Sequence, residues 1–222
     1  VMGQRIQKFI ADRERLFASI SHDLKTPLTK AKLRVEMLSD TAVKEKLLQD
    51  LDDLETMVKA SLQMVKDAAI HENTERVDLV GVLAHSLEAA EVAGLPFSLD
   101  VPETLVIECR PLSIERLFTN LVDNALHYGR SVDIEASQDA SCESVIVRVM
   151  DRGPGIPDDQ KSMVFEPYFR SGQKPSSIHV GLGLGIAKTI VQLHGGVIAL
   201  DDRNSGGLMV TIRLPQSHFV TN

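Results

Sequence analysis

His22 is the residue whose type and spacing best suit it to act as a nucleophile. It lies between Ile20 and Leu24, in a segment where apolar residues recur at three- and four-residue steps, which predicts an amphipathic helix. Two residues turn a helix by about 200°, so the imidazole is expected to point away from the apolar seam. An exposed histidine alone is usually a solvated side chain, and its neighbours must decide its role.

The residues that follow His22 favour chemistry at this position. Asp23 comes next, and Thr26 lies four residues on, on the same helix face as His22. Pro27 removes a backbone hydrogen bond and clashes with the carbonyl of Asp23, so the helix is expected to bend or loosen there. An imidazole beside a carboxylate, a hydroxyl and a loosened turn is a candidate nucleophile.

Two asparagines in the second half could bind an oxygen-rich ligand. Asn120 and Asn124 are four residues apart in a predicted helix over 111–127, so they share one face. Amide oxygens can also help to hold Mg²⁺, which takes few protein ligands beside phosphates and water. Taken alone, two asparagines on a helix surface are an ordinary feature.

Two glycine-rich segments come after these asparagines. Asp151 ends a predicted strand and is followed by Arg152-Gly153-Pro154-Gly155, where a ligand can approach the backbone closely. Gly181-Leu182-Gly183-Leu184-Gly185 opens another predicted helix, whose first N–H groups suit a phosphate. The polar segment 170–180 between them is a candidate lid. Each of these signals is weak by itself.

Residues 5–70 are predicted to be helical almost throughout. One apolar seam runs over 6–38, with Arg13 as a polar interruption, and a second runs over 43–65. Ser39-Asp40-Thr41 supplies cap residues for the second helix. One hairpin buries little apolar surface, so two copies are expected to form a four-helix bundle, a homodimer through residues 1–70. The alternative is a hairpin packed on the second half of the same chain.

The rest of the chain predicts a second domain over 77–222, after a linker at 71–76 that has no apolar period. Helices and strands alternate there without a βαβ repeat. The whole chain is therefore predicted to be α+β, an antiparallel helical hairpin followed by an α/β sandwich whose mixed sheet carries helices on one face. The expected helices are 79–93, 111–127 and 185–194, and the expected strands are 97–101, 104–109, 132–137, 144–151, 197–201 and 208–214.

The composition limits the function classes. Hydrophobic residues make up 43% of the chain and charged residues 25%, which suits a globular protein. A net charge of -7 argues against a nucleic-acid binder. Cys109 and Cys142 are expected to be apolar filler rather than disulfide partners or zinc ligands. No apolar run reaches the roughly 18 residues of a membrane span, and no signal peptide is visible.

The motif around His22 carries a resemblance to a known family. Ser21-His22-Asp23-Leu24-Lys25-Thr26-Pro27-Leu28 resembles the H-box of sensor histidine kinases of two-component systems, the HisKA dimerisation and phosphotransfer type. The resemblance implies that His22 accepts a phosphoryl group and that Asp23 orients the ring and takes its proton. It also implies that Thr26 positions water when the enzyme removes phosphate from its partner.

The segments of the second half, in this order, resemble the N, G1, F and G2 boxes of the GHKL ATPase superfamily, with residues 165–170 matching the F-box. This resemblance implies ATP and Mg²⁺ as cofactors. Asn124 then coordinates the metal with support from Asn120, Asp151 reads the adenine amino group, and Tyr128 packs near the nucleotide. The implied nucleotide-binding residues are Asn120, Asn124, His127, Tyr128, Asp151, Gly153, Gly155, Ile156, Arg170, Gly181, Leu182, Gly183 and Leu184.

Together the resemblances imply a kinase that phosphorylates its own His22 and passes the phosphoryl group to an aspartate on a response regulator receiver domain. The run Pro111-Leu112-Ser113-Ile114 is similar to that of osmosensor-type members. The full-length protein is then expected in the bacterial inner membrane, through segments outside this chain, with this core in the cytoplasm. The alternatives are a non-catalytic dimeric nucleotide-binding scaffold and a GHKL-type serine kinase or ATPase.

Two departures from the family pattern predict weak ATP binding or slow autophosphorylation. His127 stands where the family usually has Lys or Arg, and an unperturbed imidazole is mostly neutral at pH 7. His179-Val180-Gly181 lacks one glycine and one hydroxyl of the usual G2 start. We expect His127→Lys to raise ATP affinity in a binding titration, and an unchanged affinity would count against a phosphate contact at position 127.

Overall fold

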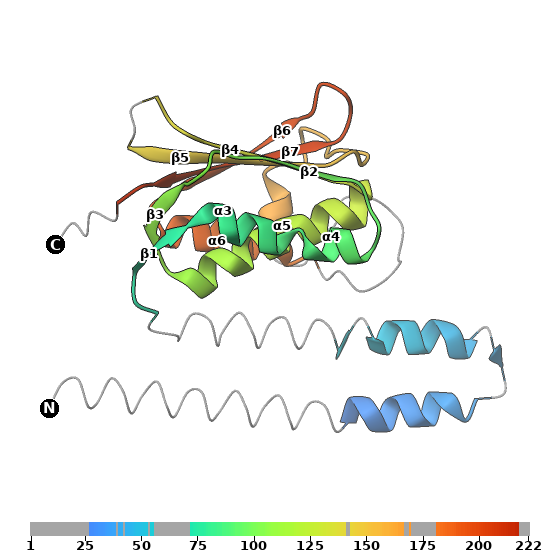
Figure 1. Cartoon of the computed structure of the whole chain (residues 1–222). Coiled ribbons are helices and arrows are strands. Elements are labelled where there is room, and N and C mark those ends of the chain that lie inside the picture. Colours follow the sequence, from blue (N-terminus) through green and yellow to red (C-terminus); the bar gives the residue numbers. More distant parts are fainter. Residues whose placement is uncertain are drawn as a thin grey trace, which may run out of the picture. The chain divides into compact units, whose positions relative to one another are not determined.

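The computed structural model describes residues 27–38, 40–41, 43–52, 54–55, 72–140, 143–166, 169 and 181–217 (Figure 1). The described residues up to 55 belong to one compact unit and those from 72 onward to another, and each unit is described by itself. Within these ranges, no helix has both the length and the apolar character that crossing a membrane requires.

The first unit contains two antiparallel helices, drawn in blue in Figure 1, which confirms the predicted hairpin. Residues 27–36 and 43–52 are helical. Asp40 begins the second helix as predicted, because its Oδ1 accepts a hydrogen bond from the N–H of Val43 at 3.2 Å. Lys32 joins the helices through ion pairs with Asp52 and Glu55, both at 2.5 Å.

The second unit is built on a mixed sheet, as predicted, and this sheet has five strands. The strands lie in the order β2 (Phe97–Asp100), β4 (Val132–Gln138), β5 (Ser144–Met150), β7 (Leu208–Pro215) and β6 (Val197–Asp202). Only the pair of β2 with β4 is parallel. A separate antiparallel pair joins β1 (Glu75–Asp78) to β3 (Val106–Cys109).

Helices α3 (Leu79–Ser86), α4 (Glu88–Val92), α5 (Pro111–Gly129) and α6 (Gly183–Leu193) lie on one face of this sheet (Figure 1). Strand β7 alternates buried and more exposed side chains, as expected when one face packs against helices. Complete burial of one large aliphatic or aromatic side chain stabilises the folded state by roughly 1.5–3 kcal/mol relative to an exposed side chain. The largest fully buried side chains include Phe118, Leu79, Leu83, Ile107, Ile114 and Leu117.

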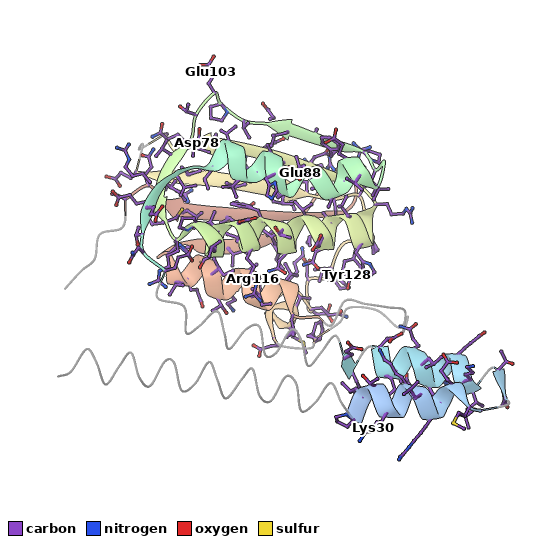
Figure 2. All side chains as sticks on the ribbon, turned by 60° about the horizontal axis from the view of Figure 1, so that its bottom comes forward. Lys30, Asp78, Glu88, Glu103, Arg116 and Tyr128 are labelled. Atoms are coloured by element: carbon purple, nitrogen blue, oxygen red, sulfur yellow. The ribbon has the colours of Figure 1, made fainter. Side chains whose placement is uncertain are left out.

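Two features of this unit differ from the sequence expectation. The predicted helix 79–93 is interrupted at Leu87, so α3 and α4 are separate. Strand β1 begins at Glu75, within the stretch 71–76 that lacks an apolar period. Pairing with β3, rather than any local repeat, makes this stretch a strand. Asp78, labelled in Figure 2, ends β1 and caps α3, because its Oδ1 accepts a hydrogen bond from the N–H of Val80. The same oxygen also accepts the N–H of Leu105.

Side chains distant in sequence hold the start of α5. The N-cap residue, Arg110, makes no side-chain capping bond. Instead, the carboxylate of Glu72 accepts hydrogen bonds from the N–H groups of Leu112 and Ser113 and from the Ser113 hydroxyl. The buried ring of His194, just after α6, accepts the N–H of Arg110 at 3.1 Å. These contacts satisfy N–H groups that a helix start otherwise leaves unpaired.

Candidate functional site

Helix α5 presents the two predicted asparagines beside its buried face. Leu117, Leu121 and Ala125 are buried, as expected, while Asn120 and Asn124 are half-buried. The side-chain Nδ2 of Asn120 is buried and has no hydrogen-bond partner among the residues that the structure describes. An unpaired buried donor is costly in a folded protein, and it suits a site that a polar ligand completes.

The start of α6 meets Asn124. A Cβ placed on Gly183 would lie 3.0 Å from Nδ2 and 3.2 Å from Oδ1 of Asn124. Gly183 therefore lets the first turn of α6 lie directly against this amide. The first N–H groups of the eleven-residue helix α6 are consequently close to the asparagine face of α5.

Adding a methyl group at Gly183 should disturb this contact. We expect Gly183→Ala to push the Asn124 amide aside and to weaken binding of ATP with Mg²⁺, the ligands that the resemblance implies, about fivefold, the equivalent of one ordinary hydrogen bond. Gly81→Ala is the matched control, because Gly81 is also helical and a Cβ there would meet nothing within 4 Å. Isothermal titration of both variants measures the effect, and equal affinities would contradict it.

The end of α5 lies against the turn that follows β5. A Cβ on Gly129 would be 2.6 Å from the Cβ of Asp151, and one on Gly153 would be 2.9 Å from the carbonyl oxygen of Tyr128. Both glycines therefore permit a close backbone approach. Figure 2 labels Tyr128 near this end of α5 and Arg116 nearer its start. Helix α5 thus links the Asp151 turn at its end to the start of α6 at Asn124.

Asp151 is a buried carboxylate, with 7% of its surface exposed. Its Oδ1 accepts hydrogen bonds from the N–H groups of Gly153 at 2.7 Å and Leu208 at 3.2 Å. Burial raises the pKa of Asp151 above its usual value, although these two hydrogen bonds and the charge of Arg203 oppose the shift. Both hydrogen bonds end on Oδ1, so a ligand amino group can be accepted at Oδ2.

The turn after Asp151 and the start of α6 both need glycine, for its positive φ or for its lack of a Cβ. Gly155 and Gly181 have φ values of +71° and +73°, in the region that glycine adopts without strain. A Cβ on Gly185 would lie 2.9 Å from the carbonyl oxygen of Phe165, so α6 also packs closely on the 3-10 turn η1 (Met163–Phe165). Lys188 of α6 lies 4.9 Å above the Phe165 ring.

The remaining predicted residues divide into two groups. His127 and Tyr128 lie at the end of α5, where their rings meet edge to face with centroids 4.6 Å apart. Leu182 is buried, whereas Ile156 and Leu184 are half-buried near the two ends of the site. His22, Asp23, Thr26 and Arg170 lie outside the described residues, as do His179 and Val180.

Comparisons with known proteins agree with both halves of the chain. Residues 12–69 match the family model "His Kinase A (phospho-acceptor) domain". Residues 109–218 match "Histidine kinase-, DNA gyrase B-, and HSP90-like ATPase". A solved structure of the mycobacterial sensor histidine kinase MprB is 30% identical, with a TM-score of 0.59 and coverage of 64% of this chain and 99% of that chain. The chain belongs to the sensor histidine kinase family.

Two further relatives show how much of this chain, and how much of each relative, is matched. The sensor histidine kinase GtrS of Pseudomonas aeruginosa is 42% identical over 221 residues, which cover 97% of this chain and 44% of the relative. The histidine kinase domain of the E. coli osmosensor EnvZ is 28% identical, with a TM-score of 0.52 and coverage of 69% of this chain and 95% of that structure. The chain spans less than half the length of GtrS.

The geometry adds residues to the candidate site that the sequence did not single out. Gly129 and Gly207 both permit close approach to Asp151. The adjacent glycines Gly206 and Gly207 could have indicated a turn with positive φ values. Gly129 gave no such signal, because a glycine at the end of a helix is commonly a cap and predicts no tertiary contact. The side chain of Arg203 donates to the main-chain carbonyl of Asp151, and no local pattern indicates that contact.

Proposed function

We propose that this chain is the catalytic core of a sensor kinase that binds ATP, phosphorylates its own His22 and passes the phosphoryl group to an aspartate of a response regulator. One observation supports this function best. Helix α5 brings Asn124 against Gly183 at one point and Gly129 against Asp151 at another. The asparagine pair, the Asp151 turn and the glycines at the start of α6 are therefore parts of one site. A nucleotide needs such a site, because its base and its phosphates bind to separate groups of the protein.

The roles at the nucleotide site follow from the chemistry of each group. Asp151 accepts the adenine amino group at Oδ2, and the backbone at Gly181 and Gly183 lines the triphosphate. The unpaired Nδ2 of Asn120 and the amide of Asn124 fit a polar ligand that carries oxygen atoms.

Asn124 would hold Mg²⁺, with Asn120 in support. The described residues contain no group of three His, Cys, Asp or Glu that could bind a metal by itself. A site of this kind suits Mg²⁺, which commonly takes one or two protein ligands and completes its shell with phosphate oxygens and water. When bound, the ion supplies neutralisation of the phosphate charge.

The reaction is an in-line phosphoryl transfer. A neutral ring nitrogen of His22 attacks the γ-phosphorus, and the N–P bond forms as the bond to the β,γ-bridging oxygen breaks and ADP leaves. The proton of the resulting cationic ring goes to Asp23. A receiver-domain carboxylate then attacks the phosphorus and restores free His22. Thr26 positions the water that later hydrolyses the phosphorylated partner.

Pairing of two copies completes the proposal. Residues 1–70 form the dimerisation and phosphotransfer domain, 71–76 the linker and 77–222 the ATP-binding domain. The described residues of the first unit leave large apolar side chains exposed, which suits burial in a four-helix bundle. The exposed fractions are 62% for Leu33, 84% for Met37, 48% for Val43, 37% for Leu47 and 48% for Leu54. The core works in the cytoplasm, and the full-length protein is held in the inner membrane by segments outside this chain.

Incubation of the whole chain with γ-labelled ATP and Mg²⁺ tests the kinase against its alternatives. The proposal predicts a label that acid removes and base does not, which is lost in His22→Ala and in Asn124→Ala. His85→Ala is the matched control and keeps the label, because His85 is an exposed histidine on α3 that pairs with Glu88. An unlabelled wild-type chain would favour the scaffold, and an acid-stable label would favour a serine kinase.

A further inference from the structure

The guanidinium of Arg203 joins two parts of the second unit. Arg203 lies in the turn between β6 and β7, with 19% of its side chain exposed. Its Nη2 donates to Oδ2 of Asp133 at 2.6 Å, and its Nη1 donates to the main-chain carbonyl oxygen of Asp151 at 3.3 Å. The planar guanidinium has donors in fixed directions, so one side chain can hold both acceptors at a set separation.

Asp133 provides Arg203 with a fixed anchor. It lies on β4 with 14% of its side chain exposed, and its Oδ1 accepts a hydrogen bond from the Ser98 hydroxyl on β2 at 2.7 Å. Burial alone would raise the pKa of Asp133, but the hydrogen bonds from Ser98 and Arg203 and the charges of Arg203 and Arg152 outweigh it and lower that pKa. Asp133 is therefore ionised at neutral pH and holds the guanidinium.

The turn that carries Arg203 also fixes Asp151 directly. The N–H of Asp151 donates to the carbonyl of Leu208 at 2.9 Å, and the N–H of Leu208 donates to Oδ1 of Asp151 at 3.2 Å. A Cβ on Gly207 would lie 2.8 Å from the carbonyl carbon of Asp151. The N–H of Arg203 donates to the carbonyl of Gly207 at 3.1 Å, so Arg203 and the contact points belong to one tight turn.

We propose that Arg203 is a positioning residue for purine recognition: by bridging Asp133 and the carbonyl of Asp151, it aims the Asp151 carboxylate so that the site prefers a purine with a 6-amino group. This inference rests on the proposed role of Asp151 in binding the adenine amino group. Arg203 also favours the ionised form of Asp151 through its charge, which strengthens acceptance of a hydrogen bond from that amino group.

The test compares ATP with purine riboside triphosphate, which lacks the 6-amino group. In the wild-type chain we expect ATP to bind about tenfold more tightly or better, the usual worth of a hydrogen bond to a charged group. In Arg203→Met, which keeps an apolar stem, the preference should fall to about threefold or less while the affinity for purine riboside triphosphate stays unchanged. A purely structural role would weaken both nucleotides equally and leave the ratio intact.

Two further variants complete the design. Arg213→Met is the matched control, because Arg213 of β7 pairs with Asp139 at 2.5 Å, and it should keep the wild-type preference. Asp133→Asn removes the charge that anchors Arg203 and replaces one of the two accepting oxygens of Asp133 by a donor nitrogen, so it should lower the preference as Arg203→Met does. If Arg203→Met fails to fold, Asp133→Asn tests the role of Arg203 in its place.

The outcomes separate this inference from the proposed function. If folded Arg203→Met, or Asp133→Asn in its place, keeps the wild-type preference while Asp151→Asn loses it, Asp151 reads the amino group and the role of Arg203 is refuted. If the wild-type chain shows no preference and Asp151→Asn binds ATP normally, the proposed role of Asp151 itself is refuted, and that of Arg203 with it.

Discussion

Replacing Asp151 by Asn should lower the affinity for ATP by about tenfold to a hundredfold, the range expected for a lost hydrogen bond to a charged group. The asparagine Oδ1 can still accept the N–H groups of Gly153 and Leu208, which now bond to Oδ1 of Asp151. The local fold should therefore survive. The asparagine Nδ2 then replaces an acceptor by a donor at the position proposed to face the adenine amino group.

This reversal also predicts a change of specificity. Inosine triphosphate carries a 6-oxo acceptor in place of the amino group, so Asp151→Asn should bind it better relative to ATP than the wild-type chain does. Nucleotide titrations of both proteins measure the two ratios. Asp158→Asn, in the same loop between β5 and η1 but exposed and paired with Lys161, should behave as wild type. Equal ATP affinity in Asp151→Asn and the wild type would show that the Asp151 carboxylate makes no contact with the nucleotide.

Gly207→Ala should produce the largest loss of stability, about 3 kcal/mol or more. Gly207 has a φ of +110°, which strains any residue with a Cβ. The added Cβ would also overlap the carbonyl oxygen of Asp151, a backbone atom that cannot turn aside. The β6–β7 turn would have to move away from Asp151, and ATP affinity should fall with stability.

Gly206→Ala separates strain from overlap. Gly206 also has a positive φ, +86°, but a Cβ there would meet nothing within 4 Å, so its cost should be about 1 kcal/mol. The chain has no Trp, and its two tyrosines, Tyr128 and Tyr168, both come after residue 72. Denaturant unfolding followed by tyrosine fluorescence therefore reports the ATP-binding unit. Similar losses in the two variants would show that the contact with Asp151 contributes nothing.

The sequence predicted the parts of the fold that depend on local periodicity. The long apolar stripe of α5 fixed its extent to within two residues at its end, and it placed Asn120 and Asn124 on one face beside the buried residues. The strands predicted over 144–151 and 208–214 likewise lie within one residue of the observed bounds of β5 and β7. These patterns repeat often enough along the chain to outweigh the error at any one position.

Features that depend on tertiary contacts could not be predicted from the sequence. Strand β1 has only four residues and forms because it pairs with β3. The N–H groups at the start of α5 bond to the carboxylate of Glu72, which lies forty residues before Leu112 in the sequence. The contact of Arg203 with Asp133 spans 70 residues, and nothing in the local composition indicates it. Likewise, the sequence marked Gly183 as a phosphate-loop glycine but gave no sign that it lies against Asn124.

The measurement that tests the central claim most directly is the location of the phosphoryl group after the whole chain reacts with ATP and Mg²⁺. Digestion and mass spectrometry at neutral or alkaline pH preserve a phosphorus–nitrogen bond long enough to assign it to a residue. The account predicts a single modified residue, His22. Phosphate on a serine, threonine or tyrosine, or release of free phosphate with His22 unmodified throughout, would contradict it.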